Sequence, residues 1–392
     1  MYCTLKNYVC KSIIAISLGL STTYLSIASA DVIDSLQPGH WLEISNTNLS
    51  SVYPSPTPGG NTGPSSIMST WNGGAFDTKR NRLMVWGGGH MDYFGNEMYA
   101  FDISTMTWSR ITDPSPTLVA CTLYMSDGQP GIHHTYNTLQ YSGLIDSFIS
   151  VMGGGYGSNC GTIVNRDTTT DLFKISTNTW GKGSLQPASG GTIDRISAVD
   201  PATGLIYSHG TYGGSRLIEY NPLKDTWKIK SSSEYLEIGS TAAIDPIKRL
   251  MVAVGGYGGK RQIVVWDLTK DTGYGFVPTT SGDTTLEYNK NMGFQYDPTI
   301  NKFVGWLDGT DVYVLDPTTW VWTKMAASSD NAVTPTAAPN GTFGRFRYIP
   351  SKNAYILVNS TTGNVYFYKL NSNSVLGKPN TPGKPSETVN PL

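Results

Sequence analysis

The stretch TAAIDPIKRLMVAVGGYGGKRQIVVWD, residues 241–267, holds the pattern that decides the fold. An apolar run ends at the pair Asp245-Pro246, a second apolar run opens into glycines at Gly255, and a third, alternating run ends at Asp267. Short apolar and alternating runs form strands, whereas Asp-Pro pairs and glycines form the turns that end them. The stretch therefore predicts consecutive short strands of an antiparallel sheet.

The same pattern recurs along the chain in a constant register. In three of the repeats the glycine stands ten residues after the turn aspartate: Asp77 and Gly87, Asp200 and Gly210, Asp245 and Gly255. A tryptophan six residues after the third run marks a fourth strand, as at Trp108, Trp227 and Trp322. Units of ~45 to 60 residues with four short strands are typical of β-propeller blades.

Six first strands can be counted, starting near Asn72, His134, Arg195, Ser240, Met292 and Arg345. The last unit lacks its tryptophan strand, whereas residues 40–44 form a fourth strand that precedes any first strand. We expect Trp41 in this segment to pair with residues 365–368, because such pairing removes the open edges of the ring. The predicted fold class is all-β: a single propeller of six four-stranded blades closed by the N-terminal strand, with seven blades as the alternative.

The two ends of the chain are expected to lie outside the propeller. Lys6 and Lys11 precede the apolar residues 12–27, and a run of small residues ends at Ala30, which predicts a signal peptide over residues 1–30 with cleavage after Ala30. No later apolar run approaches ~20 residues, so we expect no membrane anchor and a secreted or periplasmic protein. The propeller is assigned to residues 31–370 and a disordered, proline-rich tail to residues 371–392.

Composition narrows the class of partner. The chain has 28 Lys plus Arg against 29 Asp plus Glu, and only 15% of its 392 residues are charged. Such a near-neutral balance gives no field that would attract nucleic acid, so we expect no nucleic-acid partner. The oligomeric state is not indicated.

Two cysteines, Cys121 and Cys160, remain once the leader with Cys3 and Cys10 is removed. An even count in an exported chain predicts one disulfide, Cys121 to Cys160, bracing the loops of one blade. The alternative is a reactive thiol or a metal-binding pair.

The glycine-rich ends of the second strands, with spaced Tyr and Trp after them, resemble Kelch-type β-propellers. Exported bacterial propellers with His, Tyr and Arg on one face are also similar, in fold and residue type, to polysaccharide lyases of the ulvan-lyase type. Galactose oxidase is a propeller relative whose copper site needs a cysteine-crosslinked tyrosine, which this sequence does not supply. We therefore expect no cofactor and no metal.

Loops between second and third strands meet the starts of first strands at one end of each blade, because every strand reverses direction. The polar residues that depart from the repeat fall in these segments. Four are predicted to be catalytic: His90, His134, Arg195 and Tyr156. Six more are predicted to bind substrate on the same face: Tyr93, Tyr136, Tyr212, Tyr257, His209 and Arg345.

These residue types favour an exported lyase that cleaves an acidic, uronate-containing polysaccharide by β-elimination. Arg195 would pair with the uronate carboxylate, His134 would take the C5 proton, His90 or Tyr156 would protonate the leaving oxygen, and Arg345 would hold a neighbouring sugar. The alternative is a non-catalytic propeller that binds a glycan or a protein. A metal site built from His90, Asp92 and His134 is a third possibility.

Overall fold

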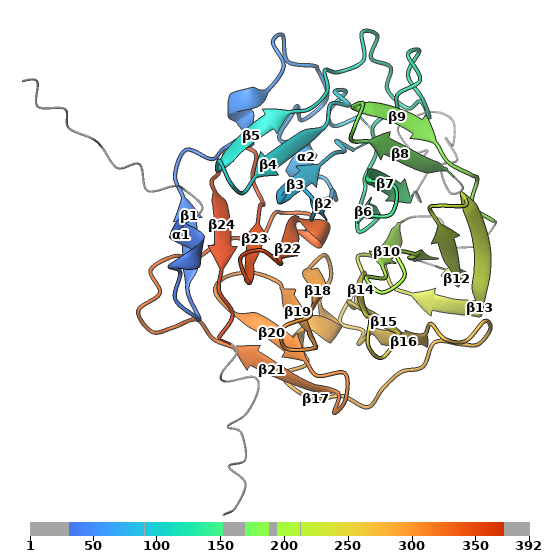
Figure 1. Ribbon diagram of the computed structural model, residues 1–392, viewed down its shortest axis with the longest axis vertical. Coiled ribbons are helices and arrows are strands. Elements are labelled where there is room, and N and C mark those ends of the chain that lie inside the picture. The colour runs from blue at the N-terminus through green and yellow to red at the C-terminus, as the bar shows by residue number, and fades with distance from the viewer. Residues whose placement is uncertain (1–30, 90, 152–168, 188–193, 212, 372–392) are drawn as a thin grey trace, which may run out of the picture.

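Short apolar strands pair into six mainly antiparallel sheets, which stand as blades around a central axis (Figure 1). The computed structural model describes residues 31–89, 91–151, 169–187, 194–211 and 213–371. The predictions of an all-β class and of six blades are both confirmed.

Blades 1 to 3 each contain four strands in sequence order. Blade 1 comprises β2 (Gly74–Asp77), β3 (Arg82–Val85), β4 (Tyr99–Asp102) and β5 (Thr107–Arg110). Blade 2 comprises β6 (Leu139–Ser142), β7 (Ser147–Val151), β8 (Thr170–Lys174) and β9 (Thr179–Lys182). Blade 3 comprises β10 (Arg195–Val199), β11 (Ile206–Gly210), β12 (Gly213–Asn221) and β13 (Thr226–Leu236).

Blades 4 and 5 depart from the regular pattern. Blade 4 comprises β14 (Thr241–Asp245), β15 (Leu250–Val254) and β16 (Ile263–Asp267). Its fourth position is taken by Phe276, which exchanges two backbone hydrogen bonds with Val265, at 2.9 and 2.8 Å. Blade 5 comprises β18 (Gly293–Asp297), β19 (Lys302–Trp306), β20 (Val312–Leu315) and β21 (Val321–Met325), with β17 (Ser281–Gly282) added parallel to β21.

Blade 6 is built from both ends of the described chain. It comprises β22 (Phe346–Ile349), β23 (Ala354–Leu357), β24 (Val365–Tyr368) and the N-terminal β1 (Trp41–Ile44). β1 lies beside β24 in Figure 1, and Trp41 pairs with Tyr368 in the antiparallel register. The predicted closure of the ring by the N-terminal strand is therefore confirmed.

In the described residues, helical structure is limited to short turns before and between the blades. These are α1 (Asp31–Asp34), η1 (Leu49–Val52), α2 (Ser66–Ser69), η2 (Thr285–Tyr288) and η3 (Phe343–Arg345). Among the described residues, no helix has the length and apolar character needed to cross a bilayer.

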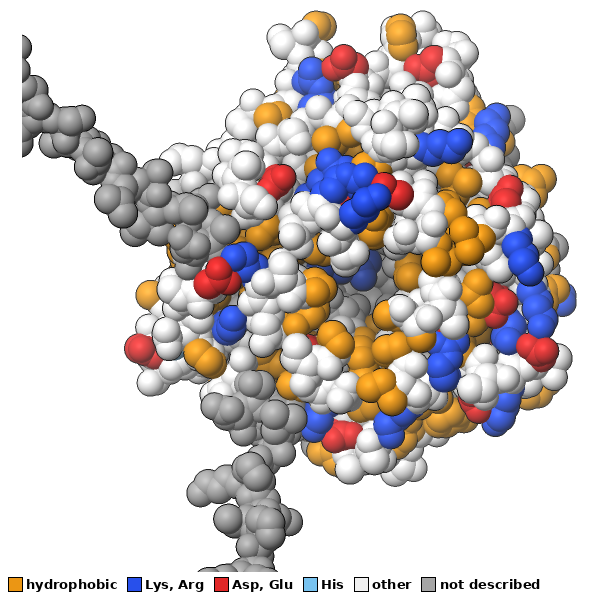
Figure 2. Space-filling model, in the orientation of Figure 1, with side chains coloured by type: hydrophobic (Ala, Val, Ile, Leu, Met, Phe, Trp, Pro, Cys, Tyr) orange, Lys and Arg blue, Asp and Glu red, His pale blue; other side chains and the backbone are white. Residues whose placement is uncertain are grey.

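The first strands β2, β6, β10, β14, β18 and β22 lie next to one another around the axis. The centre of the ring is hollowed, as Figure 2 shows. The apolar core lies between neighbouring blades: Ile196 and Tyr207 of blade 3, for example, share one buried cluster with Ile244 and Met251 of blade 4. Packing between blades therefore stabilises the ring, because each sheet buries its faces against the next.

The predicted turn aspartates organise the turns between first and second strands. Asp77 Oδ1 accepts the backbone N–H groups of Lys79 and Arg80, and Asp245 Oδ1 accepts those of Ile247 and Lys248. These carboxylates stabilise the turns locally, as expected of aspartates in turns.

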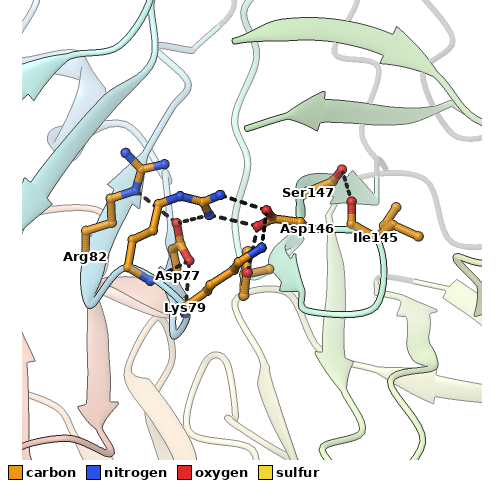
Figure 3. A network of polar contacts seen from close by, with 8 residues as sticks. Asp77, Lys79, Arg82, Ile145, Asp146 and Ser147 are labelled. Carbon is orange, nitrogen blue, oxygen red and sulfur yellow. Dashed lines mark hydrogen bonds and ion pairs between the residues drawn. The ribbon is translucent and has the colours of Figure 1, made fainter. Parts of the chain in front are cut away.

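An ionic network joins the turns of blades 1 and 2 (Figure 3). The Arg80 guanidinium donates to both carboxylate oxygens of Asp146 at 2.7 Å and to Asp77 at 3.0 Å. Arg82 donates to Asp77 at 2.9 Å, and Lys79 to Asp146 at 2.8 Å. The bidentate pair holds the two neighbouring turns together.

Candidate functional site

The loop between β3 and β4 meets the start of β6 at the end of the ring opposite the Asp-Pro turns. The backbone N–H groups of Gly88 and Gly89 point to the carbonyl oxygen of His133, at 3.4 and 3.3 Å. Asp92 from the same loop places Oδ2 3.7 Å from Nε2 of His134. The loop and the strand start therefore lie together, as the topology predicts, although His90 itself lies outside the described residues.

Three aromatic residues ahead of the first strands hold left-handed backbone conformations. The φ angles are 50° at Trp71, 43° at Tyr136 and 47° at Phe343, each three residues before its first strand. Blades 4 and 5 carry Gly239 and Asn291 at similar places, also with positive φ. Glycine and asparagine adopt this conformation readily, whereas bulky side chains seldom do. Strain of this kind concentrates at functional sites, so the three aromatic residues mark a candidate site.

These rings form a row with His134 that we call the aromatic collar (Trp71, His134, Tyr136 and Phe343). Neighbouring ring centroids along the row are 5.0, 5.8 and 5.9 Å apart. Tyr136 also donates its backbone N–H to the Trp71 carbonyl at 2.7 Å. Phe343 and Tyr136 are buried, Trp71 is half-buried, and the His134 side chain is 11% exposed. The collar therefore offers an indole and an imidazole to a ligand, with the Asp92 carboxylate beside them.

Arg195 lies at the start of β10, opposite Gly210 in the sheet, and is 1% exposed. β10 is held against blade 2 by the Ser197 N–H, which donates to the Asn137 carbonyl at 3.0 Å. A guanidinium buried in this way does not present its donors to a polymer at the surface. The structure thus places Arg195 next to blade 2, inside the wall of the ring.

Arg345 joins three segments of backbone rather than facing a ligand. Its Nε donates to the Asn72 carbonyl at 2.9 Å, its Nη1 to the Val358 carbonyl at 2.9 Å, and its Nη2 to the Gly341 carbonyl. The side chain is fully buried, and this burial lowers the pKa of Arg345 to about 9. Because its donors hold blade 6 to the start of blade 1, we leave Arg345 out of the site, contrary to the sequence-based prediction.

Tyr93 and His209 are buried as well. The Tyr93 hydroxyl donates to the Glu97 carboxylate, and burial together with that carboxylate raises the pKa of Tyr93. His209 Nε2 lies 3.4 Å from Glu234, and its ring packs 5.1 Å from that of Trp266. Both side chains are 0% exposed and belong to the packing of their blades. The prediction that they contact substrate does not fit this placement.

Tyr257, in the loop between β15 and β16, is the most exposed of the described site candidates. Its side chain is 48% exposed, and the Lys290 Nζ lies 4.1 Å from its ring centroid. The other candidates, Tyr156 and Tyr212, lie outside the described residues. So does Cys160, and the disulfide with Cys121 therefore stays a prediction.

Asp194 is a buried titratable group that the sequence analysis did not single out. Its Oδ2 accepts the Gly239 N–H at 2.8 Å, while Oδ1 has no hydrogen-bond partner among the described residues. Burial raises the pKa of Asp194 to about 7, despite the opposing effects of the Gly239 N–H and the Lys290 charge. The only sequence feature that pointed to Asp194 was its position next to Arg195. The local sequence does not show that its side chain is buried.

No family model matches the chain, and no curated protein matches its sequence. Solved structures that match include an auxiliary nutrient binding protein from Bacteroides ovatus, with 13% identity and a TM-score of 0.50, covering 84% of this chain and 76% of that one. Another is an auxiliary nutrient binding protein from Bacteroides thetaiotaomicron, with 11% identity and a TM-score of 0.49, covering 77% and 68%. At these identities the likeness concerns the fold alone. Neither of these two structures is described as a lyase.

Proposed function

We propose that this chain is an exported propeller that binds a glycan without cleaving it, through the aromatic collar. The observation that carries this proposal is the set of three aromatic residues held at positive φ before β2, β6 and β22. A sugar ring offers an apolar C–H face and polar hydroxyls, which match an indole beside an imidazole and a carboxylate. On the same proposal, residues 1–30 direct export and residues 371–392 form a tail outside the propeller.

Binding is favoured over lyase chemistry because neither Arg195 nor Arg345, the two arginines of the lyase scheme, presents its guanidinium at the surface. That scheme needs a guanidinium that pairs with the uronate carboxylate and stabilises charge as C5 loses its proton. Arg195 is buried, and the donors of Arg345 are used by backbone carbonyls. The Bacteroides ovatus neighbour, described as an auxiliary nutrient binding protein, supports a binding propeller at the level of the fold.

The test is affinity electrophoresis of the purified protein in gels that contain neutral or acidic polysaccharides. Trp71→Ala is expected to weaken binding roughly ten- to thirtyfold, the usual effect of removing an aromatic anchor. Tyr274→Ala is the matched control, since Tyr274 is an exposed aromatic residue (73%) in the outer part of blade 4. Circular dichroism of both variants checks that they are folded.

Two results would contradict the proposal. Equal retardation of wild type and the Trp71→Ala variant would exclude the collar as the binding site. Ultraviolet absorbance of an unsaturated uronate, growing while the protein is mixed with an acidic polysaccharide, would restore the lyase interpretation.

A further inference from the structure

A cavity of about 560 Å³ lies on the axis of the ring and opens on the face of the Asp-Pro turns, opposite the aromatic collar. Its walls come from the first strands of all six blades, and its mouth includes Pro201, Pro246, Pro298 and Pro350. A volume of this size suits a small ligand. The cavity is separate from the proposed glycan site, because the two lie at opposite ends of the first strands.

Arg347 of β22 lies at the inner end of this cavity. Its Nε donates to the Gly344 carbonyl at 3.0 Å, and its Nη2 to the Gly74 and Leu139 carbonyls at 3.1 and 3.5 Å. Gly74 and Leu139 begin β2 and β6, so the guanidinium reaches from blade 6 past blade 1 to blade 2. Its Nη1 donates to no group in the part of the chain that the structure describes.

No described carboxylate pairs with Arg347, although several acids stand near the mouth. Asp200 lines the cavity, but its Oδ2 pairs with Arg249 and accepts the Thr203 hydroxyl. Asp297 accepts the Tyr355 hydroxyl, and the pKa of Arg347, lowered by burial to about 10, still leaves the guanidinium charged at neutral pH. A recessed cation without a counter-ion is unfavourable, and an anion in the cavity would relieve that cost.

Two glutamines, Gln140 and Gln295, line the same cavity. The Gln295 side-chain oxygen accepts the Tyr348 N–H, which turns its Nε2 away, and this buried Nε2 has no partner among the described residues. Gln140 donates its Nε2 to the Ser197 carbonyl at 2.8 Å, so its oxygen is left as an acceptor. The cavity thus combines a cation and an amide acceptor within walls that are otherwise mostly small or apolar.

We propose that this axial cavity is a second binding site, which takes a small hydroxy-carboxylate anion with its carboxylate on Arg347. The guanidinium edge at Nη1 would donate to the carboxylate, and the Gln140 oxygen would accept a hydroxyl. The anion is either a free hydroxy acid or a terminal uronate of a short oligosaccharide, about one or two sugar rings in size.

The test is isothermal titration calorimetry of the full chain with sodium glucuronate, a glucuronate-terminated disaccharide, glucose and inorganic phosphate. We expect the two carboxylates to bind and glucose to bind at least about tenfold more weakly, because it lacks the charge. A preference for the disaccharide over the free acid would identify an oligosaccharide end as the ligand, and the reverse would identify a free hydroxy acid.

Two pairs of variants test whether the ligand binds in the axial cavity at Arg347. Arg347→Gln is expected to lower glucuronate affinity at least about tenfold, whereas Arg347→Lys, which keeps the charge, should lower it less. Because Arg347 also contacts backbone, a second variant leaves it untouched: Ala202→Trp at the exposed mouth should block entry. Ile247→Trp is its control, since Ile247 is exposed (68%) on a neighbouring turn and does not line the cavity.

Equal affinity for glucuronate and glucose, or unchanged glucuronate binding in the Ala202→Trp variant, would overturn the proposal. Phosphate that binds as tightly as glucuronate would also overturn it, because the site would then hold any anion. Polysaccharide retardation through the collar should be unchanged in Ala202→Trp, so failure of this site and failure of the proposed function are distinguishable.

Discussion

At the scale of single residues, Asp194 is the group whose environment differs most from what its sequence neighbours suggest. In the unfolded chain its pKa is about 3.9, whereas burial raises it to about 7 in the fold. Between these values the folded protein binds a proton that the unfolded chain releases, so the free energy of unfolding should fall as pH rises from about 4 to 7. Asp194→Asn should remove this slope and stabilise the protein at pH 8 by roughly 2–4 kcal/mol.

Urea unfolding at pH 5 and pH 8 measures this effect. Asp113→Asn is the control, because Asp113 is a largely exposed carboxylate paired with Arg110 at 2.9 Å. If wild type and the Asp194→Asn variant keep a constant difference in stability at both pH values, Asp194 does not titrate in this range.

At the scale of elements, the turn between β6 and β7 is held to the turn between β2 and β3 by Asp146. Hydrogen bonds from Arg80, and then from Lys79 and Tyr141, hold the pKa of Asp146 well below its usual range. A lowered pKa stabilises the fold above the unfolded value of about 3.9, and this stabilisation is lost as pH falls further. Asp146→Asn should therefore cost about 1–3 kcal/mol at pH 7 and progressively less towards pH 2.

Thermal unfolding across that pH range provides the measurement, with Asp311→Asn as the control. Asp311 pairs with a single exposed lysine, Lys324, so its removal should change stability by less than about 1 kcal/mol. Equal losses at the two positions would mean that the network of Figure 3 contributes no more than an ordinary surface pair.

At the scale of the whole molecule, the ring depends on β1 pairing with β24. Trp41 is 3% exposed, its ring lies 4.7 Å from that of Tyr368, and its Nε1 donates to the Thr310 carbonyl at 3.0 Å. Trp41→Ala should destabilise the protein by about 3–5 kcal/mol, because it leaves a cavity between blades 5 and 6. Guanidinium unfolding monitored by circular dichroism measures this loss. An unchanged midpoint would show that the ring is stable without this contact.

Local sequence determined the number of blades, the turns and the closing strand. Equivalents of Asp77, Gly87 and Trp108 recur along the chain at constant spacing. Turns and strand ends impose the same local geometry in each of these blades. The sequence also predicted that the loop with Asp92 lies beside His134. Successive strands of a blade run in opposite directions, so second-to-third-strand loops and first-strand starts lie at the same end of the ring. These features depend on short-range geometry, which a single sequence carries.

Only the tertiary structure decided which polar residues face a ligand. Arg345 and Arg347 stand two positions apart at one strand start. All three donor nitrogens of Arg345 bind backbone carbonyls, whereas Arg347 lines the axial cavity and its Nη1 has no partner among the described residues. The left-handed conformations of Trp71, Tyr136 and Phe343 were equally invisible in the sequence. Burial and side-chain direction depend on neighbouring blades, whose contacts join residues far apart in the chain, so the repeat pattern determines the ring but not the chemistry of its openings.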